Sequence, residues 1–316
     1  MPDRRYKMLL GLCLAALYVI WGSTYLAIRF SIETIPPFTM AGVRFLIAGA
    51  LLFLLARLRG EPAPDRRNWG AAAVVGTLLL VGGNGGVVWA EQRIDSGLAA
   101  LLVTTMPFWL VLITWLMPQG KAPTARTLVG LAIGFSGVCL LVAPGSSGAL
   151  HVDPLGALVV GLSAVSWATG SVLSRRLPLP NSPVLSTALQ MLSGGAVLLL
   201  LSVAFGEPAH FHPANVSLRS LLALAYLIVF GALVAYTAFV WLIRNAPPAI
   251  ASTYAYVNPL VAVFLGWAIA GEPLSPRILF AALVIVTGVV IVSLPARKAR
   301  PREEHAAAPV EKAATA

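Results

Sequence analysis

Charged side chains are scarce in this sequence. Asp, Glu, Lys and Arg make up 11% of its 316 residues and hydrophobic residues 58%, against roughly 25% charged and 45–50% apolar in an ordinary soluble domain. Together with a mean hydropathy of +0.85, this composition excludes a water-soluble fold. It also excludes a disordered chain and a nucleic-acid scaffold, which need more charge and fewer aliphatic side chains. The sequence therefore predicts a protein embedded in a lipid bilayer, with no nucleic-acid partner.

Cysteine, histidine and buried acids are equally rare. Cys13 and Cys139 lie in separate apolar runs outside any CxxC motif, which argues against a disulfide framework and a zinc site. All four histidines fall outside the long apolar segments: His151, His210, His212 and His305. A membrane-embedded enzyme needs nucleophiles with bases, carboxylate pairs or metal ligands within the bilayer. We therefore expect no enzyme, no cofactor and no metal site.

What the sequence does contain is long apolar segments of the roughly 20 residues that a bilayer core demands. Unsatisfied backbone groups cost several kcal/mol in hydrocarbon, and no two-residue alternation suggests a barrel, so each segment is predicted to be a helix. The first continues through Arg29 without a small-residue cleavage site, so we predict that it is retained. The ten segments lie near 8–31, 37–57, 69–90, 96–118, 125–143, 154–176, 183–205, 219–242, 248–270 and 276–294.

Lysine and arginine are unevenly distributed over the predicted loops. Seventeen of the 22 fall on the side that holds the N-terminus, and only Arg93, Arg219 and Arg277 fall on the other, while Arg29 and Arg44 lie within the first two segments. Positive charge gathers in cytoplasmic loops of membrane proteins. Both termini, including a polar tail over 295–316, are therefore predicted to be cytoplasmic.

The two halves of the sequence resemble each other. Matched residues recur in order at offsets of 146, then 152, then 151, and each predicted half holds five helices. Because five is odd, the second half must enter the membrane from the opposite side. We predict two inverted repeats, 8–143 and 154–294. The pairs are Trp21 with Trp167, Arg29 with Arg175, Pro37 with Pro183, Trp89 with Trp241, Pro107 with Pro259, Trp115 with Trp267, Gly120 with Gly271, Arg126 with Arg277, and Gly137 with Gly288.

Several local motifs resemble one family over about residues 8–294. They are the run from Trp21 to Tyr25, Arg44-Phe45, the prolines Pro107 and Pro259, and the Gly271-Glu272 step. The chain resembles the EamA family of the drug/metabolite transporter superfamily. The resemblance implies a bacterial inner-membrane exporter of amino acids, other metabolites or toxic compounds, with its fifth and tenth helices peripheral. Lys121 departs from the pattern, because a Glu like Glu272 is expected there.

Aromatic residues in the first and sixth segments are candidates for a solute site. Tyr18, Trp21, Tyr25 and Arg29 recur at spacings of three and four and so share one helix face. Trp167, Ser171 and Arg175 repeat that stripe in the sixth segment. Aromatic rings that face a cavity stack on aromatic or alkyl solutes. The alternative is helix packing or an interfacial aromatic belt.

The third segment contains the run Gly82-Gly83-Asn84-Gly85-Gly86. A run this poor in side chains permits either close packing by another helix or exposure of backbone and Asn84 to a polar cavity. We place Asn84, and its repeat counterpart Tyr236, among the candidate site residues.

Prolines interrupt the fourth and ninth segments. Pro107 and Pro259 each remove a helical hydrogen bond, which leaves the carbonyls of Val103 and Ala255 as spare acceptors. These positions are candidate gating hinges, and the alternative is a static kink. Beside Pro259, Tyr254 and Asn258 share a face at spacing four. We favour them as site residues over Tyr256, which points the other way.

Arg44 is the deepest charge in the sequence, eight residues into the second segment. An intramembrane ionisable residue indicates function by default, such as binding a substrate carboxylate; snorkelling or helix capping is the alternative. No acid lies near the centre of a predicted helix, and six lie in or beside external loops: Glu33, Glu91, Asp95, Asp153, Glu207 and Glu272. Of these, Glu33 or Glu91 could couple protons.

These observations predict a secondary transporter that exports small molecules by alternating access, with a passive channel as the alternative and oligomeric state left open. The predicted substrates are neutral or aromatic amino acids, related metabolites or amphipathic drugs. The predicted cavity residues are Trp21, Tyr25, Arg44, Asn84, Trp167, Tyr236, Tyr254 and Asn258, with Pro107 and Pro259 as hinges.

Overall fold

The protein is helical throughout the part of the chain that its computed structural model describes, namely residues 4–118, 122–143, 153–246, 250 and 253–293, and these residues contain no strand. The first half comprises α1 (Arg4–Ala16), η1 (Leu17–Trp21), α2 (Gly22–Ser31), α3 (Pro37–Leu58), α4 (Arg66–Gly76), η2 (Thr77–Gly85), α5 (Gly86–Ala90), α6 (Ser96–Val103), α7 (Met106–Leu116) and α8 (Ala125–Val142). The second comprises α9 (Pro154–Leu173), α10 (Pro183–Ala204), α11 (Glu207–His210), η3 (Pro213–Asn215), α12 (Leu218–Tyr226), η4 (Leu227–Val234), α13 (Ala235–Asn245), α15 (Tyr254–Ala270) and α16 (Pro276–Ser293).

Many of these helices join into longer stretches that are suited to a bilayer. Among the described residues, seven continuous helical stretches are long and apolar enough to cross a membrane, and three apolar helices are shorter: Ala125–Leu141, Val257–Ala270 and Pro276–Val292. The predicted all-helical membrane class is confirmed, while the count of ten crossings stays a prediction. The tail 295–316, Lys121 and the side chains of Ala255 and Tyr256 lie outside the described residues.

Helix starts follow from local sequence. Proline occupies the first position of α3, α9 and α10, where its missing N–H is no loss and its fixed φ suits a helix. Side chains of Asp65, Thr124, Asp153, Ser182 and Ser217 accept hydrogen bonds from N–H groups in the first turns that follow, as N-cap residues do. The N–H of Gly156, and then Arg93, hold the pKa of Asp153 below its usual value.

Three helical stretches widen into π-helical turns. These are η1, η2 and η4, and wide turns of this kind occur frequently at functional sites. In η2, added Cβ atoms at Gly82 and Gly83 would stand 2.2 Å from Ser166 Oγ and 2.7 Å from the Trp167 ring. The glycine run therefore packs closely against α9, and Ser166 donates to the Leu78 carbonyl at 2.7 Å.

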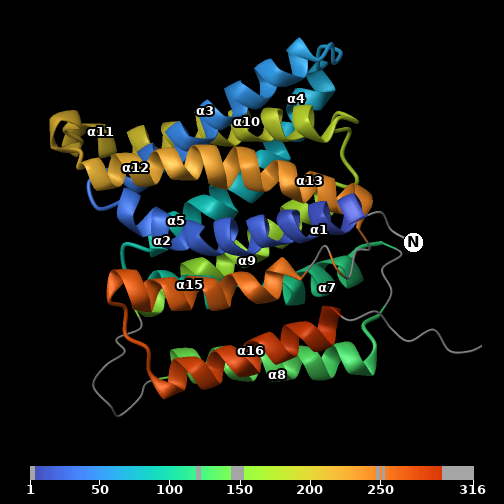
Figure 1. Ribbon diagram of the computed structural model, residues 1–316, viewed down its shortest axis with the longest axis vertical. Helices are drawn as coiled ribbons and strands as arrows, with labels where there is room; N and C mark the ends of the chain where they lie inside the picture. Colours follow the sequence, from blue (N-terminus) through green and yellow to red (C-terminus); the bar gives the residue numbers. More distant parts are fainter. Residues whose placement is uncertain (1–3, 119–121, 144–152, 247–249, 251–252, 294–316) are drawn as a thin grey trace, which may run out of the picture.

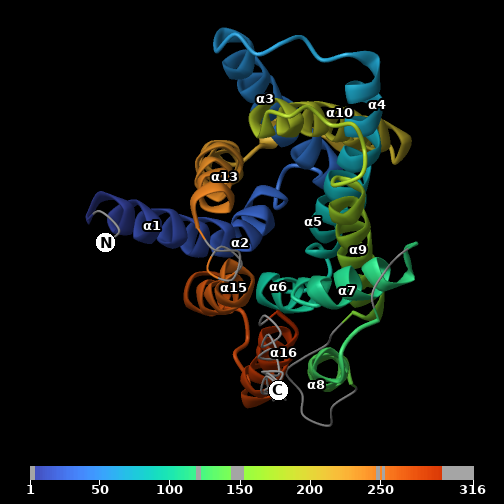
Figure 2. The same ribbon diagram turned by 90° about the vertical axis from the view of Figure 1, so that its right-hand side faces the viewer.

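The helices lie side by side, roughly parallel or antiparallel, and run across the long axis of the molecule (Figure 1). The principal packing pairs are α3 with α10, α8 with α16, α6 with α15, α9 with η2, α2 with α12, α2 with α15, and α7 with α9. The α8–α16 pair lies at one end of the molecule, away from α3, α4 and α10, and Figure 2 shows α8, α13 and α15 nearly end-on. Helices α2, α5, α6, α9 and α15 occupy the middle.

The two prolines behave differently. The helix is interrupted at Thr104 and Thr105, so that α6 ends and α7 begins just before Pro107. The hydroxyls of these threonines donate to the carbonyls of Ala100 and Leu102. Pro259 is instead enclosed within the continuous helix α15. Thus the fourth predicted segment contains two turn residues just before its proline, whereas the described part of the ninth continues as one helix through its proline.

Candidate functional site

An aromatic cluster joins three helical stretches. The Trp21 ring lies 5.2 Å from the Phe239 ring and 5.2 Å from the Tyr254 ring, the latter edge-on, and Phe239 is 5.8 Å from Tyr254. The Trp21 indole N–H donates to the Gly231 carbonyl at 3.1 Å. The cluster thus connects η1, α13 and α15, and its edge-to-face geometry is favourable for aromatic rings.

Asn258 and Tyr236 flank this cluster. With its amide oriented so that both neighbours are satisfied, Asn258 donates to the carbonyls of Tyr254 at 3.1 Å and Leu17 at 3.3 Å. Tyr236 lies 6.4 Å from Phe239, but its hydroxyl is held on α10 by Thr187 and the Pro183 carbonyl.

Trp167 and Asn84 belong to a separate contact, between α9 and η2. Trp167 packs against Gly83 and is 37% exposed, while the Asn84 side-chain oxygen is buried without a hydrogen-bond partner among the described residues. The structure therefore brings together Trp21, Tyr236 and Tyr254 with Asn258 beside them, and leaves Trp167 and Asn84 at the η2–α9 contact.

Arg44 reaches the same region from α3. It is 6% exposed, and its guanidinium carbon lies 4.9 Å from the centre of the Phe45 ring. A Cβ added to Gly231 would stand 3.5 Å from Arg44 Nη2 and 3.3 Å from the Thr24 methyl. Gly231 thus separates Arg44 from Trp21, and both Nε and Nη1 of Arg44 are buried without partners among the described residues.

A second group of charges joins α2, α6 and the α15–α16 connection. Arg29 Nη1 donates to Asp95 Oδ1 at 2.8 Å and to Glu272 Oε1 at 3.1 Å. Glu272 also accepts from Ser96 N at 2.9 Å, Ser96 Oγ at 2.6 Å and Gly97 N at 3.0 Å. A carboxylate at the start of α6 complements the helix dipole, and the four donors satisfy its charge.

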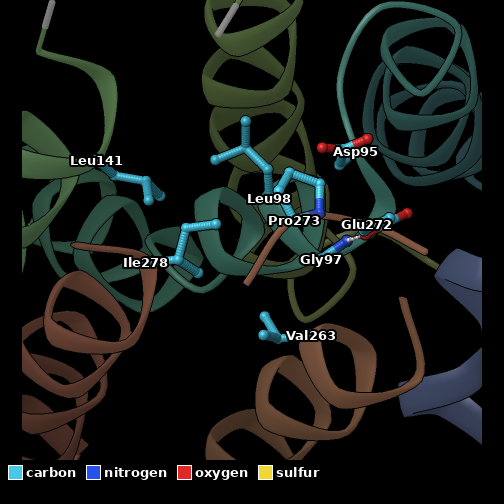
Figure 3. A pocket seen from close by; sticks show the side chains of 8 residues that line it. All are labelled: Asp95, Gly97, Leu98, Leu141, Val263, Glu272, Pro273 and Ile278. Atoms are coloured by element: carbon cyan, nitrogen blue, oxygen red, sulfur yellow. Dashed lines mark hydrogen bonds between the residues drawn. The ribbon is translucent and has the colours of Figure 1, made fainter. Parts of the chain in front are cut away.

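Gly271 explains how Glu272 reaches that position. Its φ of +67° ends α15 in the left-handed conformation, and Glu272 N donates to the Gly266 carbonyl at 3.0 Å. This C-terminal motif is typical of glycine and turns the chain back toward α6. Figure 3 shows the Glu272 side chain beside Gly97, with Asp95 nearby.

Glu91 is the unexpected charge of this region. It directly follows α5, is 4% exposed, and neither carboxylate oxygen has a hydrogen-bond partner among the described residues. Burial raises the pKa of Glu91 well above its ordinary value, Glu272 raises it further, and Arg29 and Arg44 oppose the shift. Tyr25 lies close enough to interact electrostatically with both Glu91 and Tyr254.

Two cavities lie near the charged end of the bundle. One of about 20 Å³ is lined by Asp95, Gly97, Leu98, Leu141, Val263, Glu272, Pro273 and Ile278 (Figure 3), and is large enough only for about one water molecule. The other, of about 330 Å³, is lined by Ile35, Thr39, Met40, Val43, Phe211, Pro213, Val216, Leu221 and Leu224. None of the predicted site residues lines either cavity.

Phe239 and the burial of Glu91 and Glu272 are features that the sequence pattern did not predict. Phe239 lies three residues after Tyr236, so helical spacing could have identified it. Glu91 and Glu272 were assigned only to the external loops or their edges, because each follows an apolar segment, and no sequence signal shows that other helices cover them. Within the described residues, no three His, Cys, Asp or Glu side chains are grouped as metal ligands would be.

The sequence profile of the EamA-like transporter family matches residues 9–143 and again residues 154–294. The chain belongs to this family. It is 44% identical over 293 residues to the inner membrane transporter YedA of Escherichia coli K12, covering 92% of this chain and 93% of YedA. It is 27% identical over 283 residues to the transporter YvbV of Bacillus subtilis 168, covering 90% of this chain and 91% of YvbV.

One solved crystal structure shares the fold. It aligns with a TM-score of 0.63 at 20% identity, over 91% of this chain and 98% of the other. This EamA-family chain is therefore a membrane transporter of the bacterial inner membrane, and its helices lie in a lipid bilayer.

Proposed function

We propose that this EamA-family protein is a secondary carrier that exports small amphipathic molecules, amino acids among them, by alternating access. Its ten predicted helices form two inverted five-helix halves around a shared path, with both termini cytoplasmic. The solute lies against Trp21, Tyr25, Tyr236, Tyr254 and Asn258, with Arg44 at its anionic group. Asn84 and Trp167 line the same path at the η2–α9 contact in another state of the cycle.

The helix packing is the observation that supports this proposal. Exchange of each helix for its predicted counterpart converts every principal packing pair either into itself or into another pair that is present. The contact of α9 with η2 corresponds to the contact of α2 with α12 and η4. The contacts of α9 with α6 and α7 correspond to the contact of α15 with α2. Three pairs correspond to themselves: α3–α10, α6–α15 and α8–α16. Two halves that pack interchangeably are suited to exchanging conformations around a central site.

Ion pairs at one end support a closed gate there in this conformation. Arg29 ties α2 to Asp95 and Glu272. These residues belong to the side that the charge distribution predicts to be external. The broken helix at Thr104–Thr105 provides a place where α7 can move relative to α6, with Pro107 and Pro259 as hinges.

Counterflow by purified protein in liposomes tests this function against the alternative of a passive channel. Vesicles loaded with an unlabelled solute should transiently accumulate the same labelled solute above its equilibrium level, and the initial rate should saturate. We expect this for at least one member of a panel of neutral amino acids, aromatic amines and aromatic carboxylates. Flux without saturation or counterflow would favour a channel.

A further inference from the structure

Two buried carboxylates at the charged end of the bundle differ sharply in their surroundings. Glu272, 6% exposed, accepts hydrogen bonds from Arg29, from the N–H and hydroxyl of Ser96, and from the N–H of Gly97. Glu91, 4% exposed, accepts none from the described residues at either oxygen. A buried carboxylate without a partner is strongly disfavoured unless a proton or another cation neutralises it.

Arg44 is a second buried charge without partners among the described residues, on a helix that packs against α5. Its charge influences Glu91, yet the two side chains form no ion pair, and Nε and Nη1 of Arg44 are also without partners in the described part of the chain. Two opposite charges that are buried on neighbouring elements and separately unsatisfied are suited to a ligand that carries both charges.

We propose that Glu91 binds the ammonium group of the transported molecule while Arg44 binds its anionic group. This inference rests on the proposed carrier function and narrows the substrate to a zwitterion with an apolar body. The body lies against Tyr25 and Trp21, because Tyr25 is within electrostatic reach of Glu91 and of Tyr254, which is itself 5.2 Å from Trp21. Gly231 lies between Arg44 and Trp21, and its missing side chain lets Arg44 Nη2 approach its backbone closely.

The protonation state of Glu91 agrees with this role. Its pKa is raised, chiefly by burial and then by Glu272, which favours the protonated, uncharged carboxyl when no ligand is bound. An ammonium group that binds the carboxylate replaces that proton, which passes to the solvent. Arg29 is already engaged by Asp95 and Glu272, so it does not supply the missing countercharge.

Three ligands that each carry a phenyl ring distinguish the contributions of the ammonium group and the anionic group to binding. Phenylalanine carries both, phenethylamine carries only the ammonium group, and 3-phenylpropionate carries only the carboxylate. Binding to the purified, full-length protein is measured by scintillation proximity with labelled phenylalanine, and the other two are measured as competitors. We expect phenylalanine to bind tightest, because only it satisfies both residues.

Glu91→Gln should lower the affinity for phenylalanine and phenethylamine roughly tenfold or more, the usual loss for a charge-assisted hydrogen bond. It should leave the affinity for 3-phenylpropionate within about twofold. Arg44→Gln should show the reverse pattern. Glu33→Gln is the matched control, because Glu33 is an exposed acid on the same side, paired with Arg219, and it should change none of the three. Glu91→Asp keeps the charge and is a second variant if Glu91→Gln does not fold.

An equal loss of affinity for all three ligands in Glu91→Gln would overturn the proposal and assign Glu91 a structural role. No loss of affinity at all would also overturn the proposal. If the unsubstituted protein binds none of the three ligands but shows counterflow of another solute, the zwitterion site is wrong and the carrier function stands. If no solute of the panel shows counterflow, the carrier function itself fails.

Discussion

Arg29 and Glu272 are 243 positions apart in the chain, and the guanidinium of Arg29 donates to the Glu272 carboxylate at 3.1 Å. The contact joins α2 in the first half to the α15–α16 connection in the second. Since Glu272 also binds the first turn of α6, this one carboxylate connects three elements at the end of the bundle that is predicted to be external.

We expect loss of this contact to loosen the external end. In Arg29→Gln, a cysteine placed at Leu98, which lines the small cavity beside Glu272, should react several times faster with a membrane-impermeant thiol reagent added outside. The matched control is Arg219→Gln, which removes the more exposed pair with Glu33 and should leave the rate unchanged. Equal rates in Arg29→Gln and the unsubstituted protein would contradict the closed gate.

The position of the Glu272 carboxylate depends on a glycine, Gly266. A Cβ at Gly266 would stand 2.3 Å from Glu272 Oε2, so Gly266→Ala should displace the carboxylate and destabilise the protein by about 1–3 kcal/mol, as overpacking does. Gly161→Ala is the control, because nothing lies within 4 Å of its added Cβ and alanine favours the helix. Thermal unfolding in detergent should show a lower Tm only for Gly266→Ala.

Stability should depend on pH through Glu91, which is flanked by Tyr25, Arg29, Arg44 and Glu272. The fold raises the pKa of this carboxyl, so above about pH 4.3, the ordinary value for Glu, the unfolded chain releases a proton that the folded chain keeps. Stability from this group therefore falls as pH rises. Tm should decline less between pH 5 and 8 in Glu91→Gln than in the unsubstituted protein or Glu33→Gln. Parallel declines would contradict the buried, protonated carboxyl.

Replacement of Pro107 should affect transport more than abundance. Pro107→Ala provides the N–H that proline lacks, so α6 and α7 can join into one helix across Thr104 and Thr105. We expect transport in proteoliposomes to slow severalfold while the amount of protein in the membrane changes little. Pro259→Ala tests the repeat-related position within a continuous helix. Equal loss of transport and abundance would indicate that the break at Pro107 is only a structural requirement.

Much of the fold followed from the sequence, because the bilayer allows few solutions. Apolar length and proline positions placed the helices, as at Pro37 and Pro183, and a resemblance that included Gly271-Glu272 identified the family. The site was less predictable. Helical spacing predicted Trp21 and Tyr254 as site residues. It could not show that Phe239 of α13 packs against those two rings, or that neighbouring helices cover Glu91. Such burial depends on contacts between segments far apart in sequence, which periodicity within one segment does not encode.

The central claim is that one solute path opens alternately to the two sides of the membrane. It is tested most directly by a single cysteine at Trp21 in a background without Cys13 and Cys139. A second variant also carries cysteines at Arg29 and Glu272, so that the external end can be crosslinked. In sided vesicles, Trp21→Cys should react with an impermeant thiol reagent from both sides, and from the cytoplasmic side alone after crosslinking. Unchanged labelling from the external side after crosslinking would contradict the account.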